Sequence, residues 1–85
     1  MMELYFITFR SVTLAQRGEK VLQEAGLRCI LARTPRWMEE KGCGYCLRFR
    51  SADVQPWVMI LRQRGIPFRR VYLRGADGQM GEVAL

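Results

Sequence analysis

The stretch Tyr45-Cys46-Leu47-Arg48-Phe49-Arg50 decides the fold class that we predict for this chain. Its tyrosine, leucine and phenylalanine fall on one face of an extended backbone, and its cysteine and two arginines fall on the other. A period of two is typical of a strand that is buried on one face only. The segment therefore predicts a sheet with one face on the core and one face away from it.

One helix is predicted before this strand in the chain and a second helix is predicted after it. Residues 12–25 place apolar side chains at helical spacing, with Ser11 as the predicted N-cap and Gly26 as the stop signal. A second amphipathic helix follows Asp53, its predicted N-cap, and ends at Gly65. Both segments have one apolar face, which is expected to be buried.

Three further segments are predicted as strands. Residues 3–9 are almost continuously apolar, which predicts a central strand with both faces mostly covered. Residues 27–32 and 66–73 each follow a glycine that ends a predicted helix, and Pro67 suits the start or edge of a strand. The tail at 79–85 is compatible with a short strand or with a frayed end.

The predicted order of elements is strand, helix, strand, strand, helix, strand. This order predicts an α+β fold, a ferredoxin-like βαββαβ two-layer sandwich with a four-stranded antiparallel sheet. We expect two helices on one face of the sheet and a free second face. The whole chain, residues 1–85, is expected to form a single domain.

The net charge of +6 comes mainly from twelve arginines against two lysines. Arginine side chains suit oxyanions, so the charge indicates an anionic partner or a solubilising surface. No apolar run approaches the roughly 20 residues of a membrane-spanning helix, and residues 1–3 do not begin a signal peptide. Three cysteines are a low and odd count for a disulfide scaffold. We therefore expect a cytoplasmic protein with no membrane partner.

Cys43 and Cys46 form a Cys-x-x-Cys motif at the start of the alternating strand. Arginines lie before and after it, among them Arg36 and Arg48, and nearby positive charge favours the reactive thiolate form of cysteine. Gly42 and Gly44 permit close backbone approach. The motif therefore predicts an activated cysteine, and the alternative is a glycine turn in which two cysteines are incidental.

Several kinds of cysteine chemistry fit this chain poorly. A zinc or iron–sulfur site needs about four ligands, and the chain has no histidine and one further cysteine, so we predict no metal and no cofactor. A zinc site shared across a dimer stays open. A thioredoxin-like motif opens a helix, whereas a strand follows this motif, and a hydrolase nucleophile wants a histidine base. Cys29 lies among apolar residues and is expected to pack in the core.

A cysteine that carries sulfur or selenium needs exposure and cationic surroundings but no base, because a thiolate takes up the atom by attacking a sulfur–sulfur bond. In this interpretation Cys43 carries the atom. Cys46 either resolves it by forming a disulfide or packs at the start of the strand.

The motifs Tyr5-Phe6-Ile7-Thr8-Phe9-Arg10-Ser11, Thr34-Pro35-Arg36, Cys43-Gly44 and Leu47-Arg48-Phe49 resemble a small bacterial family, the putative Se/S carrier protein-like family. The resemblance covers most of residues 3–72. It implies a ferredoxin-like fold, with Phe9-Arg10-Ser11 ending the first strand and Cys43-Gly44 preceding the third. It also implies a role in carrying sulfur or selenium.

If this fold holds, Arg10 and Ser11, Thr34 and Arg36, and Cys43 with Gly44 are expected to converge at one end of the sheet. The start of the first helix would add hydrogen-bond donors for an anion there. Arg48 completes the predicted anion-binding set.

The predicted function is that of a carrier or accessory protein rather than an enzyme with its own turnover. Its expected partners are donor and acceptor proteins of sulfur or selenium transfer, such as a cysteine desulfurase, and a homodimer stays open. The alternative is a non-catalytic module that binds RNA or another anion, or that dimerises for regulation. No stretch matches the aromatic RNP1 pattern of RNA-recognition domains, which makes nucleic acid the weaker alternative.

Overall fold

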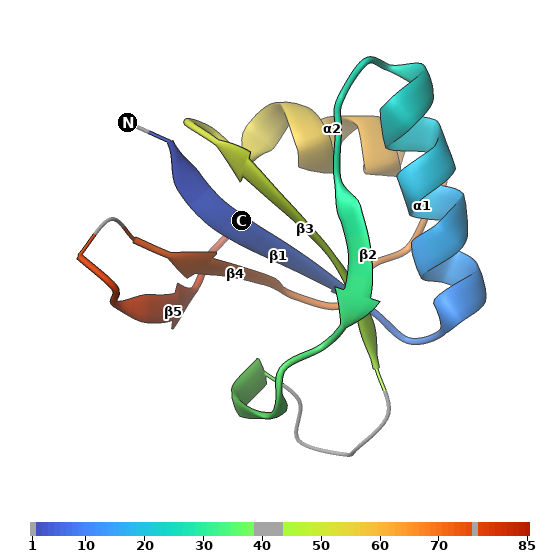
Figure 1. Cartoon of the computed structure of the whole chain (residues 1–85). Helices are drawn as coiled ribbons and strands as arrows, with labels where there is room; N and C mark the ends of the chain where they lie inside the picture. Colours follow the sequence, from blue (N-terminus) through green and yellow to red (C-terminus); the bar gives the residue numbers. More distant parts are fainter. Residues whose placement is uncertain (1, 39–43, 76) are drawn as a thin grey trace.

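The computed structural model describes residues 2–38, 44–75 and 77–85. Figure 1 shows its elements, which in chain order are β1 (Glu3–Phe9), α1 (Val12–Glu24), β2 (Ile30–Arg33), the 3-10 helix η1 (Arg36–Met38), β3 (Tyr45–Ser51), α2 (Gln55–Gln63), β4 (Val71–Arg74) and β5 (Met80–Glu82). The predicted α+β class is confirmed. Among the described residues, no helix combines the length and the apolar character needed to cross a bilayer.

The strands form one antiparallel sheet in the order β2-β3-β1-β4-β5. Helix α1 connects β1 with β2 across the intervening β3, and α2 connects β3 with β4 across β1. This split arrangement of the first four strands is consistent with the ferredoxin-like prediction. The predicted count of four strands is wrong, because the chain turns after β4 and returns as β5 along its free edge.

Two strands are shorter than predicted. Strand β2 begins at Ile30 rather than at residue 27, because the N–H of Leu27 donates to the carbonyl of Leu22 and closes the end of α1 instead. Strand β4 begins at Val71 rather than at residue 66. Pro67 has no N–H to donate to a sheet, which accounts for part of this difference.

Both residues predicted as helix N-caps accept a hydrogen bond from the first turn of their helix, although Asp53 lies one residue before the N-cap position of α2. The Oγ of Ser11 accepts a hydrogen bond from the N–H of Leu14 at 3.2 Å, so Ser11 is confirmed as the N-cap of α1. Helix α2 has Val54 at its N-cap position rather than Asp53. The side chain of Asp53 nevertheless accepts from the N–H of Gln55 at 3.0 Å, so it satisfies a donor of the first turn.

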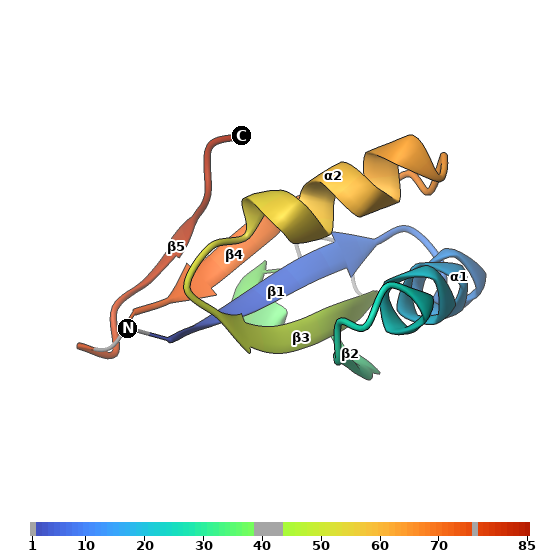
Figure 2. The ribbon, with the colours of Figure 1, turned by 90° about the horizontal axis from the view of Figure 1, so that it is seen from above.

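The main core lies between the sheet and the two helices, which cover the same face (Figures 1 and 2). Phe49 of β3 stacks on Trp57 of α2, with ring centroids 3.6 Å apart. Leu22 of α1 and Val58 of α2 are fully buried in the same cluster. This face carries the apolar half of the alternation in β3.

The prediction that the second face of the sheet is free is wrong. Phe6, Cys46 and Tyr72 form a small buried cluster there, one residue from each of β1, β3 and β4. Trp37 of η1 meets the Tyr72 ring edge to face, with centroids 5.4 Å apart. The β2–β3 connection therefore contributes a side chain to this face, and the prediction that both faces of β1 are covered is confirmed.

Candidate functional site

One end of the sheet gathers most of the segments that were predicted to form the site. Phe9, the last residue of β1, pairs with Tyr45, the first residue of β3, and Arg33, the last residue of β2, pairs with the same tyrosine from the other side. Figure 1 shows these three strand ends together, beside the start of α1. Arg10 and Thr34 each continue directly from them.

Thr34 and Gly44 are joined by a hydrogen bond at this end. The backbone N–H of Thr34 donates to the carbonyl oxygen of Gly44 at 3.0 Å, and Gly44 is buried. The side-chain hydroxyl of Thr34 is also buried, and it has no hydrogen-bond partner within the described part of the chain. A buried hydroxyl without a partner is unusual, and its position beside Gly44 makes it a candidate ligand-binding group.

The start of α1 supplies further donors at the same end. Ser11 follows Arg10 directly and caps the helix. The first N–H groups of a helix have no partner within it, and the helix dipole makes this terminus favourable for an anion. The capping bond from Leu14 to Ser11 satisfies one of these donors and fixes the direction in which the helix begins.

Three exposed arginines add positive charge around this end: Arg10, Arg33 and Arg36. The guanidinium of Arg33 lies 5.9 Å from the centroid of the Tyr45 ring, which is within range of a cation–π contact. Over residues 2–38, 44–75 and 77–85, no carboxylate forms an ion pair with any of the three. Their charge is therefore available to an anion.

Cys43 lies outside the described residues, as does most of the turn that contains it. The described structure begins again at its neighbour Gly44, which the hydrogen bond to Thr34 fixes beside the end of β2. The predictions for Cys43 itself therefore remain predictions.

Cys46 is described, and it is fully buried. It packs with Phe6 and Tyr72, and its Sγ lies 3.8 Å from the carbonyl oxygen of Arg33, to which the thiol donates. The sequence places Cys46 on the same face as Arg48, and the strand register agrees. The thiol nevertheless points into a packed cluster, so the geometry supports the alternative in which Cys46 packs.

Cys29 is confirmed as a core residue, with only 8% of its surface exposed. Burial, and then the nearby charge of Glu19, raise the pKa of the Cys29 thiol from its ordinary 9.0 to about 11. At neutral pH this cysteine is a thiol, which is the unreactive form.

Arg48 is not brought to this end of the sheet. It pairs with Ile30 of β2 and Phe6 of β1, farther along β3, and its side chain lines a separate pocket with Arg28 and Arg50. Arg48 therefore lies apart from the other members of the predicted anion-binding set, which are at the end of β1 and β2.

Sequence reasoning missed the small cluster on the second face. Phe6 and Tyr72 are apolar residues on the outward side of strands that also bury their inward side, and this pattern is the signal that was available. Their burial leaves the rings of Phe6 and Tyr72 little free surface on which an RNA base could stack. Among the described residues, no three Cys, His, Asp or Glu side chains gather closely enough to hold a metal ion.

Comparison with known proteins agrees with this arrangement of motifs. A family model described as "Putative Se/S carrier protein-like" matches residues 4–73, which is most of the chain. No curated protein and no solved structure matches this chain. The matched region runs from β1 to β4 and so includes every segment that meets at the end of the sheet. The chain therefore belongs to the Putative Se/S carrier protein-like family.

Proposed function

We propose that this protein carries a sulfur or selenium atom on Cys43 and passes it to a partner protein. The observation that supports this most directly is the group of exposed cations, Arg10, Arg33 and Arg36, which form no ion pair within the described residues, at the end of the sheet that Gly44 adjoins. Cys43 precedes Gly44 in the chain. The description of the family names the same kind of cargo.

The proposed loading step transfers one sulfur atom from a persulfide on the donor protein to the thiolate of Cys43. The thiolate of Cys43 attacks the terminal sulfur of a persulfide on the donor protein, forming a new sulfur–sulfur bond. The sulfur–sulfur bond of the donor breaks, and the donor cysteine leaves as a thiolate. The proton on the terminal sulfur stays with it, so no external oxidant, reductant or base takes part.

The described surroundings suit this step in two ways. The positive charge of the arginines favours a thiolate over a thiol, both before the attack and in the persulfide that it forms. The hydroxyl of Thr34 and the first turn of α1 offer donors for a negatively charged sulfur or selenium atom. A chain without histidine is sufficient for such chemistry.

Cys46 has a structural role in this proposal. Its burial against Phe6 and Tyr72 supports packing, and a disulfide with Cys43 would require the thiol to leave that cluster. Unloading is then an attack by a thiolate of the acceptor protein on the Cys43 persulfide, the reverse of the loading step.

The experiment is incubation with a cysteine desulfurase and cysteine, followed by intact-mass measurement without a reducing agent. We expect a gain of about 32 Da, one sulfur atom, that is removed by dithiothreitol. Cys43→Ser is expected to abolish the gain, whereas Cys46→Ala and Cys29→Ala are expected to retain it. Equal loading of Cys43→Ser and the wild type would rule out the proposal.

A further inference from the structure

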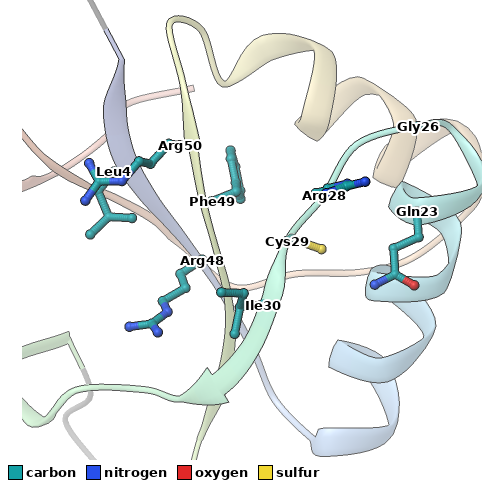
Figure 3. A pocket seen from close by; sticks show the side chains of 9 residues that line it. All are labelled: Leu4, Gln23, Gly26, Arg28, Cys29, Ile30, Arg48, Phe49 and Arg50. Atoms are coloured by element: carbon teal, nitrogen blue, oxygen red, sulfur yellow. The ribbon is translucent and has the colours of Figure 1, made fainter.

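An open pocket of about 940 Å³ lies where β2 parts from β3. Its lining includes residues of β1, the end of α1, the stretch 26–30 and β3. Figure 3 shows the stretch 26–30 forming one side of this pocket and β3 forming the other. None of the lining residues belongs to the group at the end of β1, so this is a different place on the protein.

The backbone of β3 faces this pocket without a partner strand. The last pair between β2 and β3 joins Ile30 to Arg48, whereas β3 continues to Ser51. Beyond that pair, the described chain makes no backbone hydrogen bond between β3 and the stretch 27–29.

The direction of the backbone groups of Arg50 follows from the alternation within the sheet. The N–H and C=O of Thr8 in β1 both bond toward β4, to Arg70 and Arg69. Ile7 therefore bonds toward β3, where its partner is Leu47, because successive residues of a strand turn to opposite sides. By the same alternation residues 46, 48 and 50 of β3 turn toward β2, so the N–H and C=O of Arg50 are directed at the gap.

Three arginines are among the residues that line the same pocket, Arg28, Arg48 and Arg50. Figure 3 shows the side chains of Arg48 and Arg50 extending to one side of the gap and that of Arg28 extending to the other. All three arginines are exposed, and no carboxylate in the described ranges of the chain forms an ion pair with them. No acidic residue is among the lining residues. The pocket therefore concentrates positive charge that the described protein does not neutralise.

The remaining lining is largely apolar. Phe49 and Cys29 are buried core residues, and Leu4 and Ile30 add aliphatic surface. Small-molecule sites typically combine such surface with a few polar groups, in volumes of about 300 to 1,000 Å³. This pocket has both properties.

We propose that this pocket binds a small organic oxyanion, a carboxylate or phosphate joined to an apolar body. The acidic group would receive hydrogen bonds from the guanidinium groups of Arg48 and Arg50, which suit the geometry of both oxyanions, and from the N–H of Arg50. The apolar body would pack on Leu4 and Ile30, which pair with Arg50 and Arg48 and therefore lie on the same face of the sheet as those arginines. This site does not depend on Cys43, so its failure would leave the carrier proposal unaffected.

Titration of the full-length protein with phenylacetate and phenyl phosphate, followed by two-dimensional NMR, tests the proposal. We expect saturable shifts of the amide signals at residues 26–30 and 48–50, and weaker binding at higher salt. Phenylacetamide, which has no charge, is expected to bind at least about tenfold more weakly. Arg48→Gln/Arg50→Gln is expected to weaken phenylacetate binding by a similar factor, and Arg17→Gln on the exposed side of α1 is the control for loss of a positive charge elsewhere on the surface.

Three results would overturn the proposal. The first is equal binding of phenylacetamide and phenylacetate, which would show that the arginines select nothing. The second is a set of shifts centred on Arg10 and Arg36 instead. The third is a pocket that ignores both small oxyanions but responds to a tetraglutamate peptide, which would assign it to an acidic protein partner. NMR spectra of the variants without ligand show whether each remains folded.

Discussion

The N–H of Thr34 donates to the carbonyl oxygen of Gly44 across 3.0 Å, and this bond links the residue after β2 to the residue before β3. Gly44 is the first described residue after the turn that contains Cys43. The bond therefore fixes Gly44, which follows Cys43 in the chain, beside Arg33 at the cationic end of the sheet.

The hydroxyl of Thr34 is expected to bind the carried sulfur atom and to contribute little to the stability of the fold. Because it is buried without a partner in the described residues, Thr34→Val should change the free energy of unfolding by less than about 1 kcal/mol. The rate of persulfide loading should fall severalfold, since a donor to the charged sulfur is lost. Urea denaturation and timed mass spectrometry measure the two effects. A large loss of stability would instead assign the hydroxyl a structural role.

Arg10 and Arg36 are expected to activate Cys43 through their charge. In Arg10→Gln/Arg36→Gln, alkylation of Cys43 by iodoacetamide at pH 7 should slow severalfold, because less of the cysteine is present as thiolate. The difference should shrink at high salt, which screens exposed charges. Arg17→Gln removes one positive charge from the middle of α1 and should leave the rate unchanged. If both variants react at the wild-type rate, the arginines do not activate this cysteine.

Cys29 is expected to make the protein less stable in alkaline solution. Its pKa is raised in the folded state from 9.0 to about 11, mainly by burial, so the folded state holds the proton more tightly than the unfolded state. The contribution is fully present below pH 9 and is lost as the pH rises toward 11, with a magnitude on the order of 2 kcal/mol.

Urea denaturation between pH 8 and pH 11 checks this expectation, with Cys29→Val as the comparison. The wild type should lose more stability than the variant over this range. Tyr5, whose pKa is also raised by burial, contributes in the same direction in both proteins and cancels in the comparison. Parallel pH profiles of the two proteins would contradict the assignment to Cys29.

Gly18 is expected to be required where α1 crosses the sheet. A Cβ at this position would lie 3.1 Å from the Phe9 ring and 3.3 Å from Leu47, and both side chains are fully buried. Gly18→Val should therefore destabilise the protein by about 2 kcal/mol or more, despite the poor helix propensity of glycine. Gly81→Ala, where a Cβ meets nothing within 4 Å, is the control. Similar midpoints in urea for both variants would show that α1 can move away from the sheet.

Much of the fold could be predicted because local patterns and tertiary structure agree. The alternation in β3 and the caps and apolar faces of α1 and α2 are local signals, and each element formed within a few residues of its expected place. The exact start of β2 was not predictable from such signals. Whether the N–H of Leu27 bonds to a strand or to Leu22 depends on how α1 ends in three dimensions.

Part of the candidate site could be predicted from the expected fold. The residues at strand ends, such as Arg10 and Thr34, meet because the strand order brings those ends together, and this follows once the fold is known. The burial of Cys46 depends on Tyr72, which is distant in sequence. The separation of Arg48 from the arginines at the end of the sheet depends on the register of β3, which alternation alone does not fix.

The most direct measurement of the central claim is the distribution of sulfur among the three cysteines after brief incubation with a desulfurase and cysteine. Alkylation, proteolysis without reduction and peptide mass spectrometry assign the added sulfur, about 32 Da, to individual residues. We predict that Cys43 holds nearly all of it, while the buried thiols of Cys29 and Cys46 stay unmodified. Sulfur distributed evenly over the three cysteines, or absent from Cys43, would contradict the account.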